Sequence, residues 1–434
     1  MRMRILAAAT AAGLLAAVSG CGGGTSEEEG QTLTYWATNQ GTSLENDAEV
    51  LQPALDRFEE ETGITVELEV IPWADILNRI LAATTSGEGP DVLNIGNTWS
   101  ASLQATGAFV PFDAETLEAI DGTGRFVESS LASTGAPGQD PTSVPLYGMS
   151  YGLFYNRAMF EEAGIEEPPA TWEELIEVGQ EITGDGRWGF TLEGAAYTDN
   201  AHQAFIMGEQ HGAVPFNEDG TANFATPQQV AALQQYLDLM GEHGIVNPSN
   251  AEFSNGTQAV TEFAQGNAAM MIRQAGTMRA LEEQGMTTED YGVAPVPLPD
   301  PLPEGGRPIT SMVAGINISV FNNSDNPEGA LEFVRFMTSA QTQIELNSAY
   351  GTLPVVTDAA DDPAFQTEQL AVFQETLLEY SAPMPQVPEE SQYETLIGTA
   401  MAELFAQIAS GEEVTEADIE AQLSAANEQL TVGG

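Results

Sequence analysis

The chain has 434 residues, with 65 Asp and Glu residues against 11 arginines and no lysine, so its formal net charge at pH 7 is −54. A field of this sign repels polyanions, which excludes nucleic acid as a partner, and a small anionic ligand would need a local group of arginines. The arginines are scattered singly along the sequence. Composition therefore favours a neutral ligand. We interpret the acidity as a solvated surface adapted to a saline habitat.

The first twenty residues are typical of a secretory signal peptide. Arg2 and Arg4 precede an apolar run over residues 5–18, and the small residues Ser19 and Gly20 follow. This run is too short to span a bilayer as a transmembrane helix. Cleavage would remove two arginines and take the net charge from −54 to −56.

Cys21 follows this segment and is the only cysteine, which excludes an intramolecular disulfide. The run from Val18 to Cys21 resembles the bacterial lipobox, in which the cysteine becomes an acylated N-terminus. Residues 21–30 have no large apolar side chain to bury and indicate a flexible tether. We expect an exported protein anchored to the outer face of the cytoplasmic membrane by a lipid on Cys21. The alternative is ordinary secretory cleavage beside a stray cysteine.

The next segment predicts strands alternating with helices. Strands are expected over 33–36, 64–70 and 91–95, with helices over 50–58, ended by Gly63, and over 74–85. Such alternation indicates an α/β lobe with a largely parallel sheet, in which ligands bind beyond the carboxyl ends of the strands. About 404 residues follow the tether. That length suits two lobes.

Three of the five tryptophans stand where these strands are expected to end, at Trp36, Trp73 and Trp99. We expect them to form one ligand-facing wall, although each could instead pack beneath a loop. Aromatic faces beside amide and hydroxyl groups suit pyranose rings. The polar neighbours that supply such groups are Thr38, Asn39, Gln40, Asn97 and Thr98.

The chain then runs as an extended crossing over residues 144–160 into a second lobe. The proline-rich segment 295–308 predicts an extended surface strap, and the last hundred residues are expected to be mostly helical. A strand is expected over 188–192, and helices over 172–182, 200–211, 227–243, 257–265 and 277–284.

Motifs for catalysis are lacking. The sequence has no Gly-x-Ser-x-Gly elbow and no Gly-Lys-Ser/Thr phosphate loop, and His202, His211 and His243 lack metalloprotease spacing. We expect no metal, no cofactor and no enzymatic activity. Paired carboxylates for glycoside hydrolysis stay open, because 65 acidic residues make chance pairs inevitable.

A series of short motifs occurs in a shared order. They are Thr34 to Trp36, Phe58 to Val66, Gly89 to Val92, Leu153 to Arg157, Pro168 to Leu175, Phe263 to Ile272, Ala314 to Ile318 and Met384 to Pro388. Over residues 31–430 the chain resembles the extracellular sugar-binding proteins of bacterial ABC importers, the group that includes maltose-binding protein.

The resemblance implies a type II periplasmic-binding-protein-like α/β fold of two lobes that close on ligand about a hinge. Residues 31–143 and 297–337 would form the N-terminal lobe, and 150–290 and 343–430 the C-terminal lobe. The hinge crossings would be 144–149, 291–296 and 338–342.

The resemblance also implies which residues face the ligand. Many relatives carry a tryptophan near Gly276 and Met278, where this chain has none. Gly276 and Met278 are among the implied ligand contacts, as are the tryptophans and their polar neighbours named above. The other implied contacts are Met149, Tyr151, Glu193, Tyr197, Met312, Tyr393 and Glu394.

The function that follows is capture of a neutral sugar, expected to be an oligosaccharide. A monomeric receptor would deliver it to membrane permease subunits that act with a cytoplasmic ATPase. The alternatives are a receptor for a polyamine, a phosphate ester or iron, and a surface-anchored glycoside hydrolase.

Overall fold

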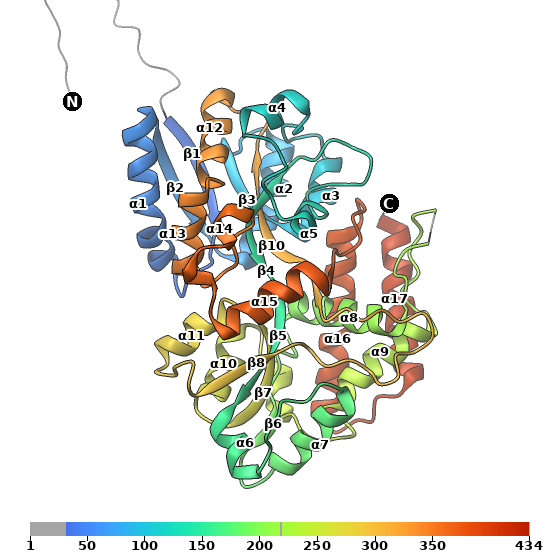
Figure 1. The fold of residues 1–434 in the computed structure, drawn as a ribbon. Coiled ribbons are helices and arrows are strands. Elements are labelled where there is room, and N and C mark those ends of the chain that lie inside the picture. The colour runs from blue at the N-terminus through green and yellow to red at the C-terminus, as the bar shows by residue number, and fades with distance from the viewer. Residues whose placement is uncertain (1–31, 218, 434) are drawn as a thin grey trace, which may run out of the picture.

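The computed structural model describes residues 32–217 and 219–433, which form two lobes stacked one above the other (Figure 1). Each lobe has its own sheet, with strand order β2-β1-β3-β10-β4 in the first and β6-β7-β5-β8 in the second. The first sheet contains β1 (Thr32–Thr38), β2 (Thr65–Ile71), β3 (Val92–Gly96), β4 (Val144–Met149) and β10 (Ala314–Val320). The second contains β5 (Tyr151–Asn156), β6 (Trp188–Phe190), β7 (Ala268–Gln274) and β8 (Tyr291–Ala294).

The alternation of strands and helices predicted for residues 33–95 is confirmed. Strand β1 pairs in parallel with both β2 and β3, so the carboxyl ends of all three strands share one edge. Gly63 ends the first helix with a φ of 77°, a left-handed conformation that glycine adopts without strain. The helices of this lobe are α1 (Leu44–Thr62), α2 (Trp73–Ser86), α3 (Ser100–Ala105), α4 (Ala114–Ala119), α5 (Glu128–Leu131), α12 (Pro327–Met337), α13 (Ala340–Tyr350) and α14 (Thr357–Ala360).

The second lobe has the predicted helices within a few residues of their expected ends. Its longest helices, α16 and α17, carry the end of the described chain and lie beside α8 and α9 (Figure 1). The helices are α6 (Arg157–Ala163), α7 (Trp172–Ile182), α8 (Tyr197–His211), α9 (Pro227–Asp238), α10 (Gly256–Ala264), α11 (Thr277–Glu283), α16 (Glu390–Ala409) and α17 (Glu416–Gly433).

The crossing between the lobes is shorter than expected. Met149 ends β4 of the first sheet and Tyr151 begins β5 of the second, so Ser150 alone separates the two sheets. Two of the three predicted crossing segments contain paired strands: 144–149 holds β4 of the first sheet, and 291–296 holds β8 of the second. Between the lobes lie helix α15 (Glu368–Glu379) and the short parallel pair of β9 (Ser311–Met312) with β11 (Ser381–Ala382).

Helix α13 belongs with the first lobe, whereas the sequence prediction assigned residues from 343 onward to the second. The Arg57 guanidinium of α1 donates to Thr342 Oγ1 over 2.6 Å and pairs with Glu345. The boundary at residue 343 was implied by the family resemblance and not by a pattern in this sequence.

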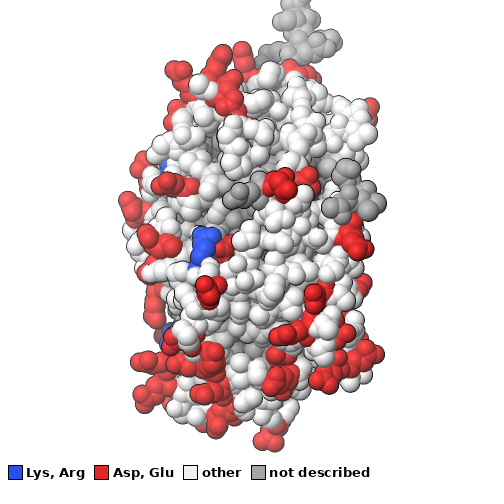
Figure 2. All heavy atoms as spheres, turned by 90° about the vertical axis from the view of Figure 1, so that its right-hand side faces the viewer, with Lys and Arg blue, Asp and Glu red and all other residues white. Residues whose placement is uncertain are grey.

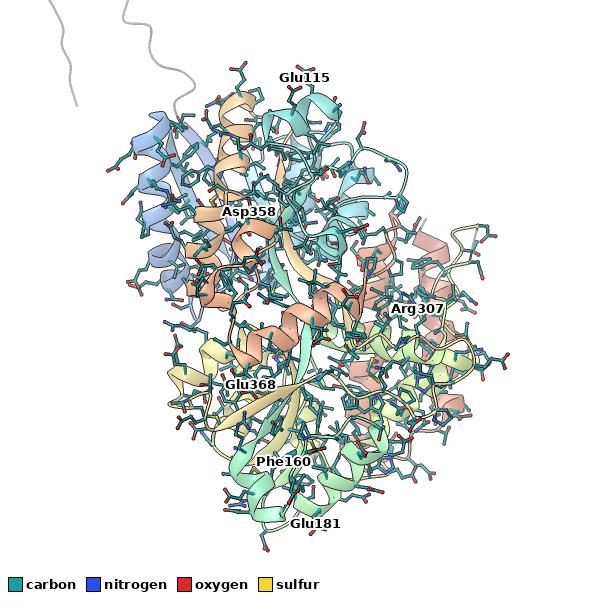
Figure 3. All side chains as sticks on the ribbon, in the orientation of Figure 1. Glu115, Phe160, Glu181, Arg307, Asp358 and Glu368 are labelled. Carbon is teal, nitrogen blue, oxygen red and sulfur yellow. The ribbon has the colours of Figure 1, made fainter. Side chains whose placement is uncertain are left out.

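Acidic side chains cover much of the surface. Figure 2 shows them gathered at both ends of one face, and Glu115 and Glu181 mark opposite ends of the molecule in Figure 3. The segment 295–308 contains no helix or strand, as predicted, and Arg307 pairs there with Glu209. None of the helices within the described residues is long and apolar enough to cross a membrane.

Candidate ligand-binding site

Two of the three tryptophans predicted to line the site meet in the structure. The rings of Trp73 and Trp99 meet edge to face with centroids 5.5 Å apart, where β2 and β3 end. Trp36 does not join this pair, because β1 continues to Thr38 and Trp36 lies within the strand. The Arg79 guanidinium lies 4.3 Å from the centre of the Trp36 ring. Trp36 therefore packs under a cation on the sheet, and the expectation that it ends the first strand is wrong.

The loop after β1 approaches this pair of indoles. The Asn39 carbonyl accepts a hydrogen bond from Trp73 Nε1 over 2.8 Å, and the Gln40 side-chain amide donates to Thr38 Oγ1 over 2.9 Å. Thr98 and Asn97 lie beside Trp99 in a single 3-10 turn and are buried. The sequence-predicted amides and hydroxyls of the first lobe thus lie at one edge of its sheet.

The two lobes contact each other directly at this edge. Trp99 Nε1 donates to Glu394 Oε2 over 3.0 Å, and Glu394 belongs to α16 of the second lobe. A neighbouring bond joins the Ser391 backbone N–H to Ser102 Oγ over 3.2 Å. Glu394 and Trp99 are 2% and 4% exposed. The structure therefore shows the lobes closed together, with these predicted site residues between them.

From Glu394 a series of hydrogen bonds continues into the second lobe. Its Oε1 lies 2.9 Å from His202 Nε2, and His202 Nδ1 lies 2.8 Å from the Tyr151 hydroxyl. That hydroxyl also lies 3.3 Å from Asp199 Oδ1. Burial raises the pKa of Tyr151 well above its ordinary value, so the hydroxyl stays protonated and can donate.

An arginine paired with two carboxylates stands at the end of this series of hydrogen bonds. Arg273 Nη1 bonds to Glu193 Oε1 at 2.5 Å and Asp199 Oδ1 at 3.0 Å. Burial raises the pKa of Glu193 to about 8, because Arg273 offsets only part of the cost of desolvating the carboxylate and the adjacent Asp199 opposes a second negative charge. Glu193 therefore takes up a proton at a higher pH than an ordinary glutamic acid does.

A small cavity adjoins this group. The volume open to the centre of a water molecule is about 10 Å³, room for about one water. Its lining includes Glu193, Gln203 and Arg273, and in each of them one buried polar atom has no hydrogen-bond partner among the described residues. Those atoms are Glu193 Oε2, Gln203 Oε1 and Arg273 Nε. Unpaired donors and acceptors at one place suit a water or a ligand hydroxyl.

Other predicted site residues lie elsewhere. Met149 and Met312 are buried where the lobes join, and Tyr393 packs against Phe216 and Phe224 in the core of the second lobe. Tyr393 points away from the site because neighbouring residues of a helix project in different directions.

The remaining predictions place Tyr197 at the start of α8, where it is 37% exposed, and Gly276 and Met278 at the start of α11. A Cβ atom built on Gly276 would lie 3.6 Å from the Tyr350 carbonyl oxygen of α13. Gly276 therefore adjoins a second contact between the lobes, and no tryptophan stands there.

The sequence reasoning missed His202, Asp199 and Arg273 as members of the site. His202 was considered only as a metalloprotease ligand and lacks the spacing for that role. A signal was available: Asp199 and His202 stand three residues apart, so a helix brings them to one face. That Arg273 would bond to Asp199 could not be inferred, because this contact joins residues 74 positions apart in the chain.

A family model described as bacterial extracellular solute-binding protein matches residues 41–344. The chain belongs to this family. The maltose-binding-protein-like fold that its motifs implied is confirmed.

Curated proteins of similar sequence align with most of this chain. A putative binding protein of Brucella abortus is 26% identical over 400 residues, covering 91% of this chain and 93% of that protein. The sn-glycerol-3-phosphate-binding periplasmic protein of Brucella melitensis is 27% identical over 322 residues, covering 68% of this chain and 70% of that protein.

Solved structures of similar fold cover nearly all of the chain. A solute-binding protein of Thermotoga lettingae bound to α-D-tagatose has a TM-score of 0.79 at 23% identity, covering 92% of this chain and 100% of that one. The GacH receptor of Streptomyces glaucescens, solved unliganded and with acarbose, has a TM-score of 0.77 at 24% identity, covering 92% and 98%. Maltose-bound MalE3 of T. maritima has a TM-score of 0.77 at 21% identity, covering 93% and 100%.

Proposed function

We propose that this solute-binding protein captures a neutral sugar between its lobes and delivers it to the permease of an ABC importer. The observation that carries the proposal is the joining of the Trp73 and Trp99 indoles to a hydrogen-bonded network that begins at Glu394 in the second lobe. Indole faces stack on the apolar face of a pyranose ring, and paired donors and acceptors bind its hydroxyls. Proteins of similar fold with tagatose, acarbose and maltose bound support a sugar.

A phosphate ester is the second candidate, because one relative is a glycerol-3-phosphate-binding protein. Binding a phosphate dianion calls for free guanidinium or ammonium groups. Arg273 already bonds to Glu193 and Asp199, and Arg307 pairs with Glu209 on the strap at the right-hand side of Figure 3. The local charge therefore favours the neutral sugar.

The proposal extends to ligand length and to the anchor. We expect an oligosaccharide, bound without hydrolysis by a monomer. The ligand-facing set is the one predicted above without Trp36 and Tyr393, and with Asp199, His202 and Arg273 added. Cys21 lies outside the described residues, and we propose that its thiol carries the lipid. Replacing Cys21 by Ser should abolish fatty-acid labelling and release the protein from the membrane, whereas retained labelling would contradict the anchor.

Calorimetry of the processed protein tests the ligand. The panel should run from monosaccharides to oligosaccharides and should include sn-glycerol 3-phosphate, spermidine and ferric citrate. Tight binding of a neutral sugar, without release of reducing ends, is the expected result. Binding of the phosphate ester or a cation alone, or turnover of a glycoside, would reject the proposal.

A further inference from the structure

A carboxylate beneath the candidate site organises the first loop. Asp47 lies in the first turn of α1 and is 0% exposed. Its Oδ1 accepts from the backbone N–H groups of Gln40, over 3.0 Å, and Gly41, over 2.8 Å. Its Oδ2 accepts from the side-chain amide of Asn39. A buried carboxylate is costly unless such donors surround it, so the loop wraps around this one group.

The same loop holds one of the two indoles. The Asn39 carbonyl accepts from Trp73 Nε1 over 2.8 Å, and the Trp73 ring meets Trp99 at 5.5 Å. The Asn39 backbone N–H donates to the Ile71 carbonyl over 3.2 Å, which extends the pairing of β1 with β2 by one residue. Hydrogen bonds thus lead from the Asp47 carboxylate through Asn39 to the indole wall.

We infer that Asp47 is the positioning residue of the ligand site. Its carboxylate fixes the loop from Asn39 to Gly41, and through the Asn39 carbonyl it fixes the orientation of the Trp73 ring. Asp47 is too deeply buried to touch a ligand, so it acts through the residues that it contacts, among which is also the Tyr350 side chain. The part of the inference that concerns sugar binding rests on the proposed function. The part that concerns the contacts of Asp47 with the loop does not.

The chain offers a matched control in Asp91. This carboxylate is also buried, at 8% exposed, and its Oδ2 accepts from the Thr34 backbone N–H over 2.8 Å and from Thr34 Oγ1 over 2.9 Å. It precedes β3 and contacts the start of β1, so it lies at the opposite edge of the same sheet from the tryptophans. Substitution there removes comparable hydrogen bonds far from the loop.

The test compares Asp47→Asn with Asp91→Asn in the exported, processed protein. Three quantities are measured: sugar affinity by calorimetry, amide hydrogen exchange at Gln40 and Gly41, and the tryptophan emission spectrum. We expect Asp47→Asn to weaken sugar binding and to speed exchange at the loop, each by about tenfold, which corresponds to the loss of about one hydrogen bond. The emission should shift to the red as Trp73 becomes more exposed. Asp91→Asn should lower the melting temperature alone.

Equal loss of affinity and equal exchange in both variants would reduce Asp47 to a structural residue and overturn the inference. Wild-type affinity with an unchanged emission spectrum in Asp47→Asn would do the same. If Asp47→Asn does not fold, Asp47→Ser, which keeps one acceptor in less volume, takes its place. If the wild-type protein binds none of the sugars, the proposed function fails. Loop exchange and emission, which need no sugar, then decide the inference.

Discussion

The indole N–H of Trp99 in the first lobe donates to the carboxylate of Glu394 in the second over 3.0 Å. Glu394 also bonds to His202, so the second lobe holds its carboxylate in place before the lobes meet. A bond across the lobes exists only in the closed arrangement. It therefore adds to the closed population, which is the population that retains ligand.

Replacing Glu394 by Ala should weaken apparent sugar affinity by about 1–3 kcal/mol, because hydrogen bonds to a charged group contribute about that much. The unliganded protein should also become more extended, which small-angle scattering measures as a larger radius of gyration. Glu345→Ala is the control, since Glu345 pairs with Arg57 on the outside of the first lobe. Unchanged affinity and radius in Glu394→Ala would show that this bond does not hold the lobes together.

Two substitutions of Trp99 separate the contribution of its ring to sugar binding from that of its N–H group. Trp99→Phe keeps most of the aromatic area, whereas Trp99→Ala removes it and should weaken sugar binding by roughly 1–3 kcal/mol. Trp99→Phe should lose only part of this free energy. The control is Trp172→Phe. The Trp172 indole donates to Gln210 inside the second lobe, so its loss should lower the melting temperature and leave sugar affinity unchanged. If Trp99→Ala keeps its affinity and melts earlier, Trp99 is a core residue.

Glu193 makes stability depend on pH in a direction that can be worked out. Burial raises its pKa from 4.5 to about 8 in the folded state. Between these two values the folded protein holds a proton that the unfolded chain has released, so the free energy of unfolding falls as pH rises through this window. Below 4.5 and above about 8 this residue adds no slope.

Glu193→Gln should therefore flatten the dependence of the melting temperature on pH between about 5 and 8. Thermal melts across that range test the prediction. Glu162→Gln, which breaks an exposed ion pair with Arg187, should leave the wild-type slope. A wild-type slope in Glu193→Gln would mean that Glu193 is ionised at neutral pH in the folded protein.

Sequence patterns located the elements of the fold and one side of the site. Strand ends near Trp73 and Trp99 could be predicted, because alternating and helical spacing show where a parallel sheet ends. Spacing did not predict the second side: Glu394 was expected only from the family resemblance, and Arg273 and Asp199, which come from two other segments, were missed. The meeting of the three depends on how β7, α8 and α16 pack, which spacing within one element does not describe.

The surface charge predicts how stability responds to salt. The whole chain carries 65 acidic residues against 11 arginines, and the described ion pairs engage only a minority of those acids. Like charges that repel one another destabilise the compact state, and raising ionic strength from about 0.1 M to 1 M shortens the screening length from about 10 Å to 3 Å. The melting temperature should therefore rise with NaCl and level off near 1 M, where screening is nearly complete. Sucrose at matched osmolality is the control, because an uncharged solute stabilises by exclusion from the surface and gives no such plateau. A melting temperature that does not change with NaCl over this range would show that repulsion among the acidic side chains does not destabilise the folded protein. The interpretation of the acidity as an adaptation to a saline habitat would then be wrong.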